Sequence, residues 1–195
     1  RLYASKPEDP ARRAAQTVMY RSLEELVVIM APILSFTTEE TWRYMNKAAG
    51  RPESVQLMSW PEAHPEVLDT ALGEKWEKIF ELRDAVNKVL EVARRDKVIG
   101  HSLDAKVTLY AKGSALAALQ AVDHDLASLL IVSKADLETG AVPAEASATD
   151  DAELFVAVGA ATGEKCERCW IYSDTVGKSA EHPTLCARCA SVLES

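Results

Sequence analysis

The chain has 195 residues and a formal net charge of −8, with 48% hydrophobic and 27% charged residues. This balance is that of a globular protein, so it excludes wholesale disorder and collagen-like repeats. A generic nucleic-acid coat would be basic, so the net charge disfavours non-specific phosphate binding. The acidity lies mainly in residues 63–158, with 10 basic and 17 acidic side chains, which leaves either end of the chain able to meet an RNA.

Nothing in the sequence predicts a membrane span or a signal peptide. The longest apolar run, Leu26 to Leu34, has nine residues and contains Pro32. A bilayer requires about 20 apolar residues, so we expect no membrane contact. No charged segment leads into an apolar stretch, and the first residue is Arg1. We therefore expect this sequence to be a piece of a longer chain.

Residues 1–62 predict helices. Asp9 and Pro10 are typical of a helix start, because Asp9 can accept bonds from free backbone N–H groups and proline loses none there. Pro32 is expected to end or kink this helix near Ala31. Between them, apolar residues at helical spacing predict one buried stripe. These residues are Ala15, Val18, Met19, Leu23, Leu26, Val27 and Met30.

A second helix is predicted from Thr38 to about Ala48. Thr37 and Glu40 stand at the spacing of a capping box, which favours a helix start at this point. The residues from Val55 to Trp60 predict a short extended stretch. Two helices of this size cannot bury their apolar stripes alone, so we expect residues 1–62 to be the end of a helical domain that begins earlier.

Residues 63–158 predict a small α+β domain built on one long helix. An amphipathic helix is expected from about Ala71 to Arg95. Apolar and polar residues then alternate from Ala105 to Tyr110, which predicts a half-buried strand.

The sequence of the rest of this domain predicts a short helix, two strands and a connecting segment. Ser114 is expected to cap a short helix that runs through Val122. Leu129–Val132 and Leu154–Val158 are predicted as strands. Residues 139–151 are rich in Ala, Ser, Thr and acidic residues, and predict a mobile connection.

All four cysteines lie in the last 30 residues, at the spacing C-x2-C-x16-C-x2-C. They are Cys166, Cys169, Cys186 and Cys189. Each pair forms a tight knuckle that directs two sulfurs at one point, and two knuckles complete the tetrahedral set of thiolates that Zn²⁺ prefers. We therefore predict one structural Zn²⁺ in a finger of residues 159–195, which is too short to fold on its own core. Four protein ligands leave no position for a catalytic water.

Three other interpretations of the cysteines are weaker. Two disulfides would require an oxidising compartment, and no secretion signal is visible. A redox CxxC pair normally opens a helix in a thioredoxin-like unit, and two such pairs would be unusual. His182, four residues before Cys186, could replace one thiolate, although a turn or surface role is favoured because four cysteines are present.

Cations and an aromatic residue surround the cysteines in the sequence. Four thiolates around Zn²⁺ carry a local charge of −2, which Lys165, Arg168 and Arg188 are placed to offset. Trp170 directly follows a predicted ligand. It either packs on the finger's own small core or offers an aromatic face to an unpaired RNA base.

Several short patterns look like catalytic motifs, and we reject them. Gly177-Lys178-Ser179 lacks the first glycine of a phosphate-binding loop. Ile99-Gly100-His101 is similar to part of an H-I-G-H signature, but it follows a helix and lacks the first histidine. The adjacent glutamates at 24–25 and 39–40 are interpreted as surface or capping acids. We therefore predict no catalytic site in this chain.

Several segments carry a resemblance to a known family. Ala14–Tyr20, Met30–Trp42 and Ser54–Leu57 with Trp60-Pro61 resemble the anticodon-binding helical domain of class I aminoacyl-tRNA synthetases. Lys97–Ala105, Gly163–Trp170 and His182–Cys189 resemble the junction and zinc finger of the isoleucyl-tRNA synthetases within that class. The implied architecture is multidomain and mainly α, with a small α+β junction and a C-terminal four-cysteine zinc finger. The predicted domains are 1–62, 63–158 and 159–195.

The resemblance implies a function for the complete protein and a part of it for this chain. The complete protein would be a cytoplasmic, monomeric isoleucine–tRNA ligase that uses ATP and Mg²⁺ in a catalytic part before Arg1. This chain would hold the anticodon arm of the isoleucine tRNA and be inactive alone. The implied metal ligands are the four cysteines. The implied RNA contacts are Trp170, Arg168, Lys165 and Arg188.

Two alternatives come from other functional classes. Similar four-cysteine fingers end the DNA glycosylases that excise oxidised bases, but those enzymes have a β-sandwich and a catalytic N-terminal residue, whereas residues 1–62 predict helices. A zinc-folded module that binds protein partners would suit the acidic middle region, but it leaves the helical motif unexplained.

Overall fold

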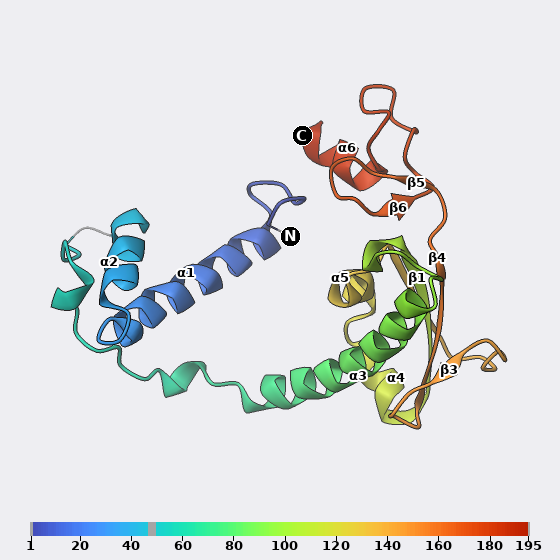
Figure 1. The fold of residues 1–195 in the computed structure, drawn as a ribbon, viewed down its shortest axis with the longest axis horizontal. Coiled ribbons are helices and arrows are strands. Elements are labelled where there is room, and N and C mark those ends of the chain that lie inside the picture. The colour runs from blue at the N-terminus through green and yellow to red at the C-terminus, as the bar shows by residue number, and fades with distance from the viewer. Residues whose placement is uncertain (1, 47–49, 195) are drawn as a thin grey trace. The chain divides into compact units, whose positions relative to one another are not determined.

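The computed structural model describes residues 2–46 and 50–194 (Figure 1). The chain divides into two compact units, one up to Leu68 and the other from Asp69 onwards. Helices form the first unit, and the second combines helices with a small sheet and a four-cysteine cluster. The predicted fold class is therefore confirmed. None of the described helices combines the length and apolar character needed to cross a membrane.

Among the described residues, the first unit contains two α-helices, and the predicted limits of the first are confirmed. Helix α1 spans Pro10–Met30 and helix α2 spans Ser35–Tyr44. Asp9 Oδ1 accepts bonds from the backbone N–H groups of Ala11 and Arg12, at 2.8 and 3.2 Å. Asp9 therefore caps α1.

The second helix starts and ends earlier than predicted. It begins at Ser35, after Leu34, whose side chain caps nothing. Thr37 lies inside the helix, so the predicted capping box is wrong. The helix ends at Tyr44, before the predicted end at Ala48, which lies outside the described residues. The backbone of Met45 is extended and stops the helix.

The residues after α2 were predicted as extended, but Val55–Leu57 forms a 3₁₀ turn, and a second spans Pro65–Val67. Glu39 explains the first turn, because its Oε2 accepts bonds from Ser54 Oγ at 2.7 Å and Val55 N at 3.1 Å. The carboxylate of Glu39 on α2 thus stabilises this turn through two hydrogen bonds. The local sequence pattern gives no sign of this contact.

Trp42 is the centre of the small core of the first unit. Its side chain is fully buried, and its ring N–H donates to the carbonyl of Pro52 at 3.0 Å. The Arg51 guanidinium lies 3.7 Å from the Trp42 ring centroid and pairs with Glu24 at 2.7 Å. One indole thus joins α2 to the following loop, and through Arg51 to α1. The other core residues are Val27, Val28, Ala31, Met45 and Val55.

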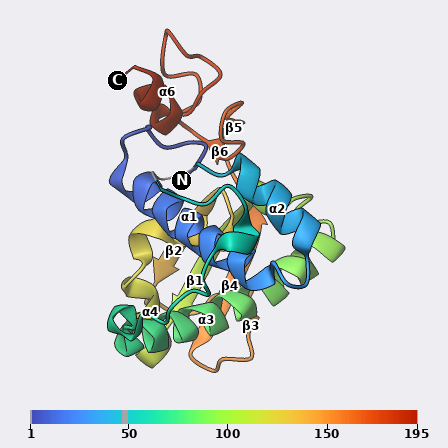
Figure 2. The same cartoon turned by 90° about the vertical axis from the view of Figure 1, so that its left-hand side faces the viewer.

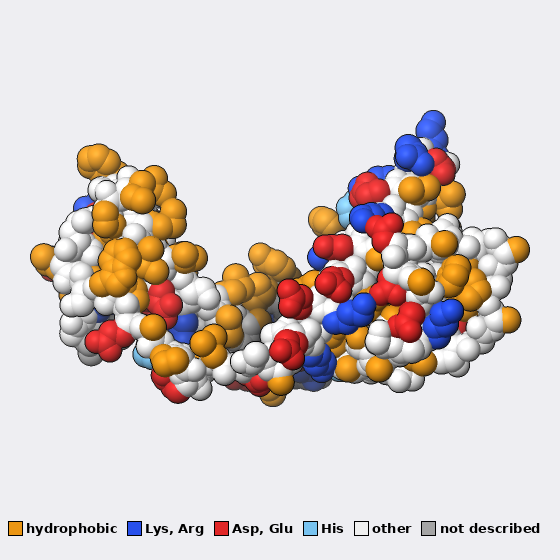
Figure 3. Space-filling view, turned by 90° about the horizontal axis from the view of Figure 1, so that it is seen from below, with side chains coloured by type: hydrophobic (Ala, Val, Ile, Leu, Met, Phe, Trp, Pro, Cys, Tyr) orange, Lys and Arg blue, Asp and Glu red, His pale blue; other side chains and the backbone are white. Residues whose placement is uncertain are grey.

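The apolar stripe predicted on α1 is mostly not buried. Of its seven residues, Val27 is buried, Ala15 is half-buried and the others are exposed; Val18, for example, is 64% exposed. Helix α2 and the 3₁₀ turn cover only the last turns of α1, so the earlier turns have nothing to pack against in this unit. Figure 3 shows apolar side chains over much of the visible surface of this unit.

The second unit contains a sheet with helices on one face (Figures 1 and 2). Among the described residues, four strands lie in the order β2-β1-β4-β3. Strand β1 is parallel to β2 and antiparallel to β4. The bounds are α3, Thr70–Arg95; β1, Ala105–Ala111; α4, Gly113–Gln120; α5, Leu126–Leu130; β2, Lys134–Glu138; β3, Ser147–Ala148; and β4, Leu154–Ala160.

The main core of the protein lies between this sheet and helix α3. Every second residue of β1 is buried, which confirms the predicted half-buried strand. Helix α3 has almost the predicted limits, and its Ile79, Leu82 and Val86 are fully buried. The apolar periodicity of both segments therefore positions them correctly.

The segment Leu129–Val132 was predicted as a strand, and this prediction is wrong. Leu126 and Leu130 are both buried on one face of helix α5, and Ile131 then adopts a left-handed backbone with φ 56°. The strand β2 begins only at Lys134. Short apolar runs fit a helix or a strand equally well, and packing decides between them.

Ser114 does not cap helix α4, which starts at Gly113 and ends at Gln120 rather than Val122. Instead, Glu153 Oε2 accepts bonds from the backbone N–H groups of Ser114 and Ala115, at 2.8 and 3.2 Å. Gly113 has φ +55°, and a Cβ there would lie 2.0 Å from Glu153 Oε1. Glycine therefore leaves room for the capping carboxylate, which lies 39 residues after Ser114 in the sequence.

Trp42→Ala is expected to unfold the first unit, because truncation of a buried tryptophan costs about 3–5 kcal/mol. The sheet of the second unit should keep its protection. Hydrogen exchange of the α1 and β1 amides measures both effects in the same sample. Trp60→Ala is the matched control, because Trp60 is 64% exposed, and a change there should stay within about 0.5 kcal/mol. Equal effects of the two substitutions would contradict the central role of Trp42.

Candidate metal centre

The four cysteines come from a hairpin and the start of a helix. Strands β5 (Glu164–Lys165) and β6 (Tyr172–Ser173) pair antiparallel, and Cys166 and Cys169 lie in the turn between them. Cys186 precedes helix α6 (Ala187–Leu193) and Cys189 lies in its first turn. Backbone bonds from Cys166 N to Ile171 O at 2.9 Å and from Trp170 N to Cys166 O at 2.8 Å close the first knuckle.

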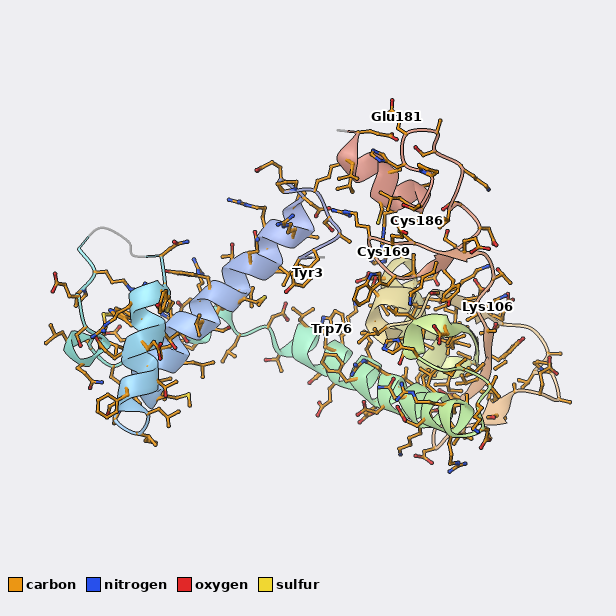
Figure 4. All side chains as sticks on the ribbon, turned by 45° about the horizontal axis from the view of Figure 1, so that its top comes forward. Tyr3, Trp76, Lys106, Cys169, Glu181 and Cys186 are labelled. Carbon is orange, nitrogen blue, oxygen red and sulfur yellow. The ribbon has the colours of Figure 1, made fainter. Side chains whose placement is uncertain are left out.

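The sulfurs of Cys166, Cys169, Cys186 and Cys189 lie within 4.8 Å of one another, and all four thiols are free. Cys169 and Cys186 Sγ are 3.7 Å apart, far beyond the length of a disulfide, about 2.05 Å. Around a tetrahedral zinc with bonds of about 2.3 Å, neighbouring sulfurs lie about 3.8 Å apart. Figure 4 labels Cys169 and Cys186 in the finger. The sulfur positions therefore fit a four-thiolate zinc site.

Burial and backbone dipoles give the sulfurs different proton affinities. Burial raises the pKa of the Cys166 thiol, but the N–H groups of Cys169, Cys186 and Arg168 lower it by more, to about 6. Cys186 N donates to Cys166 Sγ at 3.3 Å. Burial raises the pKa of Cys169 to about 12 and also raises that of Cys186. A site of four thiolates therefore requires a positive charge at its centre.

Two arginines lie against the sulfurs, as the sequence indicates. Arg168 donates to Cys189 Sγ at 3.7 Å. Burial lowers the pKa of the Arg188 guanidinium, but the sulfurs of Cys169, Cys189 and Cys186 together raise this pKa by more. Both guanidinium groups can thus offset the excess negative charge of a four-thiolate site. Lys165 is exposed on β5.

Trp170 is held in an unusual conformation at the surface of the finger. Its backbone has φ 66°, a left-handed conformation that bulky residues rarely adopt. The side chain is 62% exposed, and the ring N–H donates to Glu167 O at 3.2 Å. Most of the ring therefore faces solvent instead of packing on the small core of Cys166, Leu185, Cys186 and Cys189.

His182 lies outside the sulfur cluster, in a turn. Its backbone N–H donates to Ser179 Oγ at 3.2 Å and its carbonyl accepts from Leu185 N at 3.1 Å. Its side chain lies near those of Glu181 and Glu194, within 4.8 Å between ligand atoms. Glu181, at the outer loop of the finger in Figure 4, and Glu194 are both exposed. This arrangement agrees with a turn role for His182.

Sequence reasoning missed one residue that joins the finger to the sheet. Ser133 lies directly before β2, and its Oγ accepts a bond from the backbone N–H of Tyr172 in β6 at 2.7 Å. A single serine after an apolar run carries no sequence signal of such a contact.

Comparison with known proteins gives two family matches. Residues 1–109 match the family described as "Anticodon-binding domain of tRNA ligase", and residues 163–192 match that described as "Zinc finger found in FPG and IleRS". The second match covers all four cysteines of the cluster.

Curated relatives are similar along the whole chain. An isoleucine–tRNA ligase of Desulforamulus reducens is 48% identical over 195 residues, covering 100% of this chain and 21% of the relative. That of Syntrophomonas wolfei is 49% identical over 196 residues, covering 99% and 21%. That of Geobacter sulfurreducens is 46% identical over 192 residues, covering 98% and 21%. The chain thus spans about a fifth of the length of these relatives.

Removal of the metal by a chelator is expected to unfold the finger and leave the sheet of β1 to β4 folded. Zinc binding supplies about 10–16 kcal/mol of folding energy in finger peptides. Elemental analysis should find one zinc per chain, and amide NMR spectra before and after chelation should show loss of the finger signals alone. Cys186→Ser should lose the metal, whereas His182→Gln, the matched control, should keep it. An ordered finger after complete metal removal would refute the site.

Proposed function

Because the chain belongs to the family of anticodon-binding domains of tRNA ligases, we propose that it is the C-terminal tRNA-binding region of an isoleucine–tRNA ligase. The IleRS-type finger and the names of the relatives support isoleucine as the amino acid. The complete protein would be cytoplasmic and monomeric, and would use ATP and Mg²⁺ to attach isoleucine to its tRNA. Those ligands would bind outside the matched fifth. This chain would supply binding energy and orientation.

The exposed ring of Trp170 is the observation that best supports a particular RNA contact in this chain. RNA-binding proteins recognise unpaired bases by stacking them on aromatic rings. The Trp170 ring is mostly exposed and is held at one edge by its bond to Glu167, which leaves an aromatic face available to a base. Left-handed backbone at a bulky residue costs free energy and persists where the surroundings enforce it, often at binding sites. We infer that Trp170 stacks on an unpaired base of the anticodon arm.

The cations of the finger would have two roles. Arg168 and Arg188 lie beside the sulfurs and offset their charge, and each is also proposed to face the RNA backbone. Lys165 lies on β5, opposite Tyr172, and is proposed as a phosphate contact. Phosphate contacts position an RNA and carry no sequence information, so these three residues would fix orientation while Trp170 contacts a base.

The zinc ion would act through structure. When bound, it would hold the two knuckles together as a fixed unit. The four cysteines would be its ligands, and a closed set of four thiolates leaves no site for chemistry on a substrate. The chain's own contribution is then a rigid support for Trp170.

The finger alone does not separate an RNA function from a DNA one, because its family description names both FPG and IleRS. The match of residues 1–109 to a tRNA ligase domain favours RNA. A protein-interaction module leaves this match unexplained.

In a competition gel shift with the metal-loaded 195-residue chain, isoleucine tRNA should compete better than an unrelated duplex DNA of equal charge. Trp170→Gly should weaken tRNA binding, because base stacking on an aromatic residue is worth about 1–3 kcal/mol. Glycine accepts the positive φ, so this substitution removes the ring without straining the backbone. Trp170→Phe should retain part of the affinity.

Zinc content, measured in the same samples, should be equal in all three proteins. Equal or reversed preference for duplex DNA would support the glycosylase interpretation instead. Unchanged tRNA affinity in Trp170→Gly would exclude the tryptophan as a contact.

A further inference from the structure

The turn Ile99–Asp104, whose sequence is similar to part of a catalytic signature, holds itself in one conformation. His101 N donates to Asp104 Oδ2 at 2.7 Å, and Leu103 N donates to His101 Nδ1 at 3.2 Å. A Cβ on Gly100 would lie 3.1 Å from Asp104 Oδ2. These local bonds fix the direction of the backbone carbonyls of Leu103 and Asp104.

Both of these carbonyls accept hydrogen bonds close to the point where the chain enters the finger. Asp104 O accepts a bond from Ala161 N at 2.7 Å, directly after β4, and so extends the pairing of β1 with β4 to the point where the chain leaves the sheet toward β5. Leu103 O accepts a bond from Ser133 Oγ, and the same Ser133 oxygen accepts from Tyr172 N at 2.7 Å in β6. The turn therefore holds the end of β4 directly, and holds β6 of the hairpin through a single hydroxyl.

Close contacts within the hairpin transmit the restraint at its base to the residues at its tip. A Cβ on Gly163 would lie 2.3 Å from the backbone carbon of Ser173, so the two sides are in close contact at the base. The knuckle that carries Trp170 is closed by the bond from Cys166 N to Ile171 O. Trp170 lies only two residues from Tyr172, so restraint at Tyr172 limits where the tryptophan ring can move.

Backbone strain is concentrated around the same contacts. Among the described residues, three that are not glycine have positive φ: Lys97, Ile131 and Trp170. They lie two residues before Ile99, Ser133 and Tyr172 respectively. Such conformations persist where the surrounding structure enforces them, and they cluster at functional positions. Each segment of the attachment thus begins two residues after a left-handed residue.

We propose that the turn 99–104 is the site where the zinc finger is attached to the sheet. Ser133 would be a positioning residue whose hydroxyl fixes the orientation of Trp170 relative to the sheet. The orientation follows from these contacts alone. Its consequence for RNA affinity rests on the proposed function. Ser133 would act through Tyr172 and contact no ligand itself.

Residual dipolar couplings of the backbone amides test the orientation in the metal-loaded chain. In the native protein, the couplings of finger and sheet should fit one alignment tensor. Ser133→Ala should reduce the couplings of the finger relative to those of the sheet, while zinc content stays unchanged. Ser133→Thr, which keeps the hydroxyl, should restore them. Ser191→Ala is the matched control, because Ser191 Oγ donates within α6, to Arg188 O at 3.0 Å.

The same variants test the consequence for RNA. Ser133→Ala should weaken isoleucine tRNA binding roughly 3- to 10-fold, the range expected for one lost hydrogen bond, and Ser133→Thr should recover it. If the couplings of finger and sheet still fit one alignment tensor in Ser133→Ala, the proposed positioning role of Ser133 is wrong, whether or not the native chain binds tRNA. Loosened couplings with unchanged tRNA affinity would overturn the role of Ser133 in RNA binding. If the native chain does not bind tRNA, the proposed function is contradicted. The couplings alone then decide whether Ser133 orients the finger.

Discussion

The convergence of four sulfurs within 4.8 Å is the constraint on which the finger depends. The finger core contains little besides the cysteines, Leu185 and a few partly buried side chains, including Ile171. An apolar core of this size cannot hold a segment of about 30 residues against its conformational entropy. A metal–thiolate centre can, because binding free energy then becomes folding free energy.

The fixed geometry of the sulfurs affects function only through the residues connected to it. The β5–β6 hairpin makes this connection at both of its ends. At the tip it holds Trp170 in a left-handed conformation with most of the ring exposed. At the base, Ser133 joins β6 of the hairpin to the sheet, and the carbonyl of Asp104 holds the end of β4 from which the chain enters the hairpin; the core of this sheet on α3 is far larger. The finger thus takes its internal stability from the knuckles and its orientation from the sheet.

The first unit is stabilised differently, because its small core is organised around the fully buried Trp42. Much of the apolar surface of α1 stays exposed in this unit. Its match to the anticodon-binding domain of tRNA ligases extends to residue 109, beyond the end of the unit at Leu68 and into the sheet domain. The family match therefore joins segments that the packing separates into two units.

The sequence alone determined features that depend on neighbouring residues: the Asp9 cap, the alternation in β1, the limits of α3, and the cysteine spacing, which allows each pair to close a knuckle locally. Tertiary structure decided the rest. Leu129 and Leu130 end helix α5 because packing buries one face of that helix, and Glu153 caps α4 from 39 residues beyond Ser114. Ser133 carries no local signal at all. Periodicity and capping act over a few residues, whereas these contacts exist only after the chain has folded.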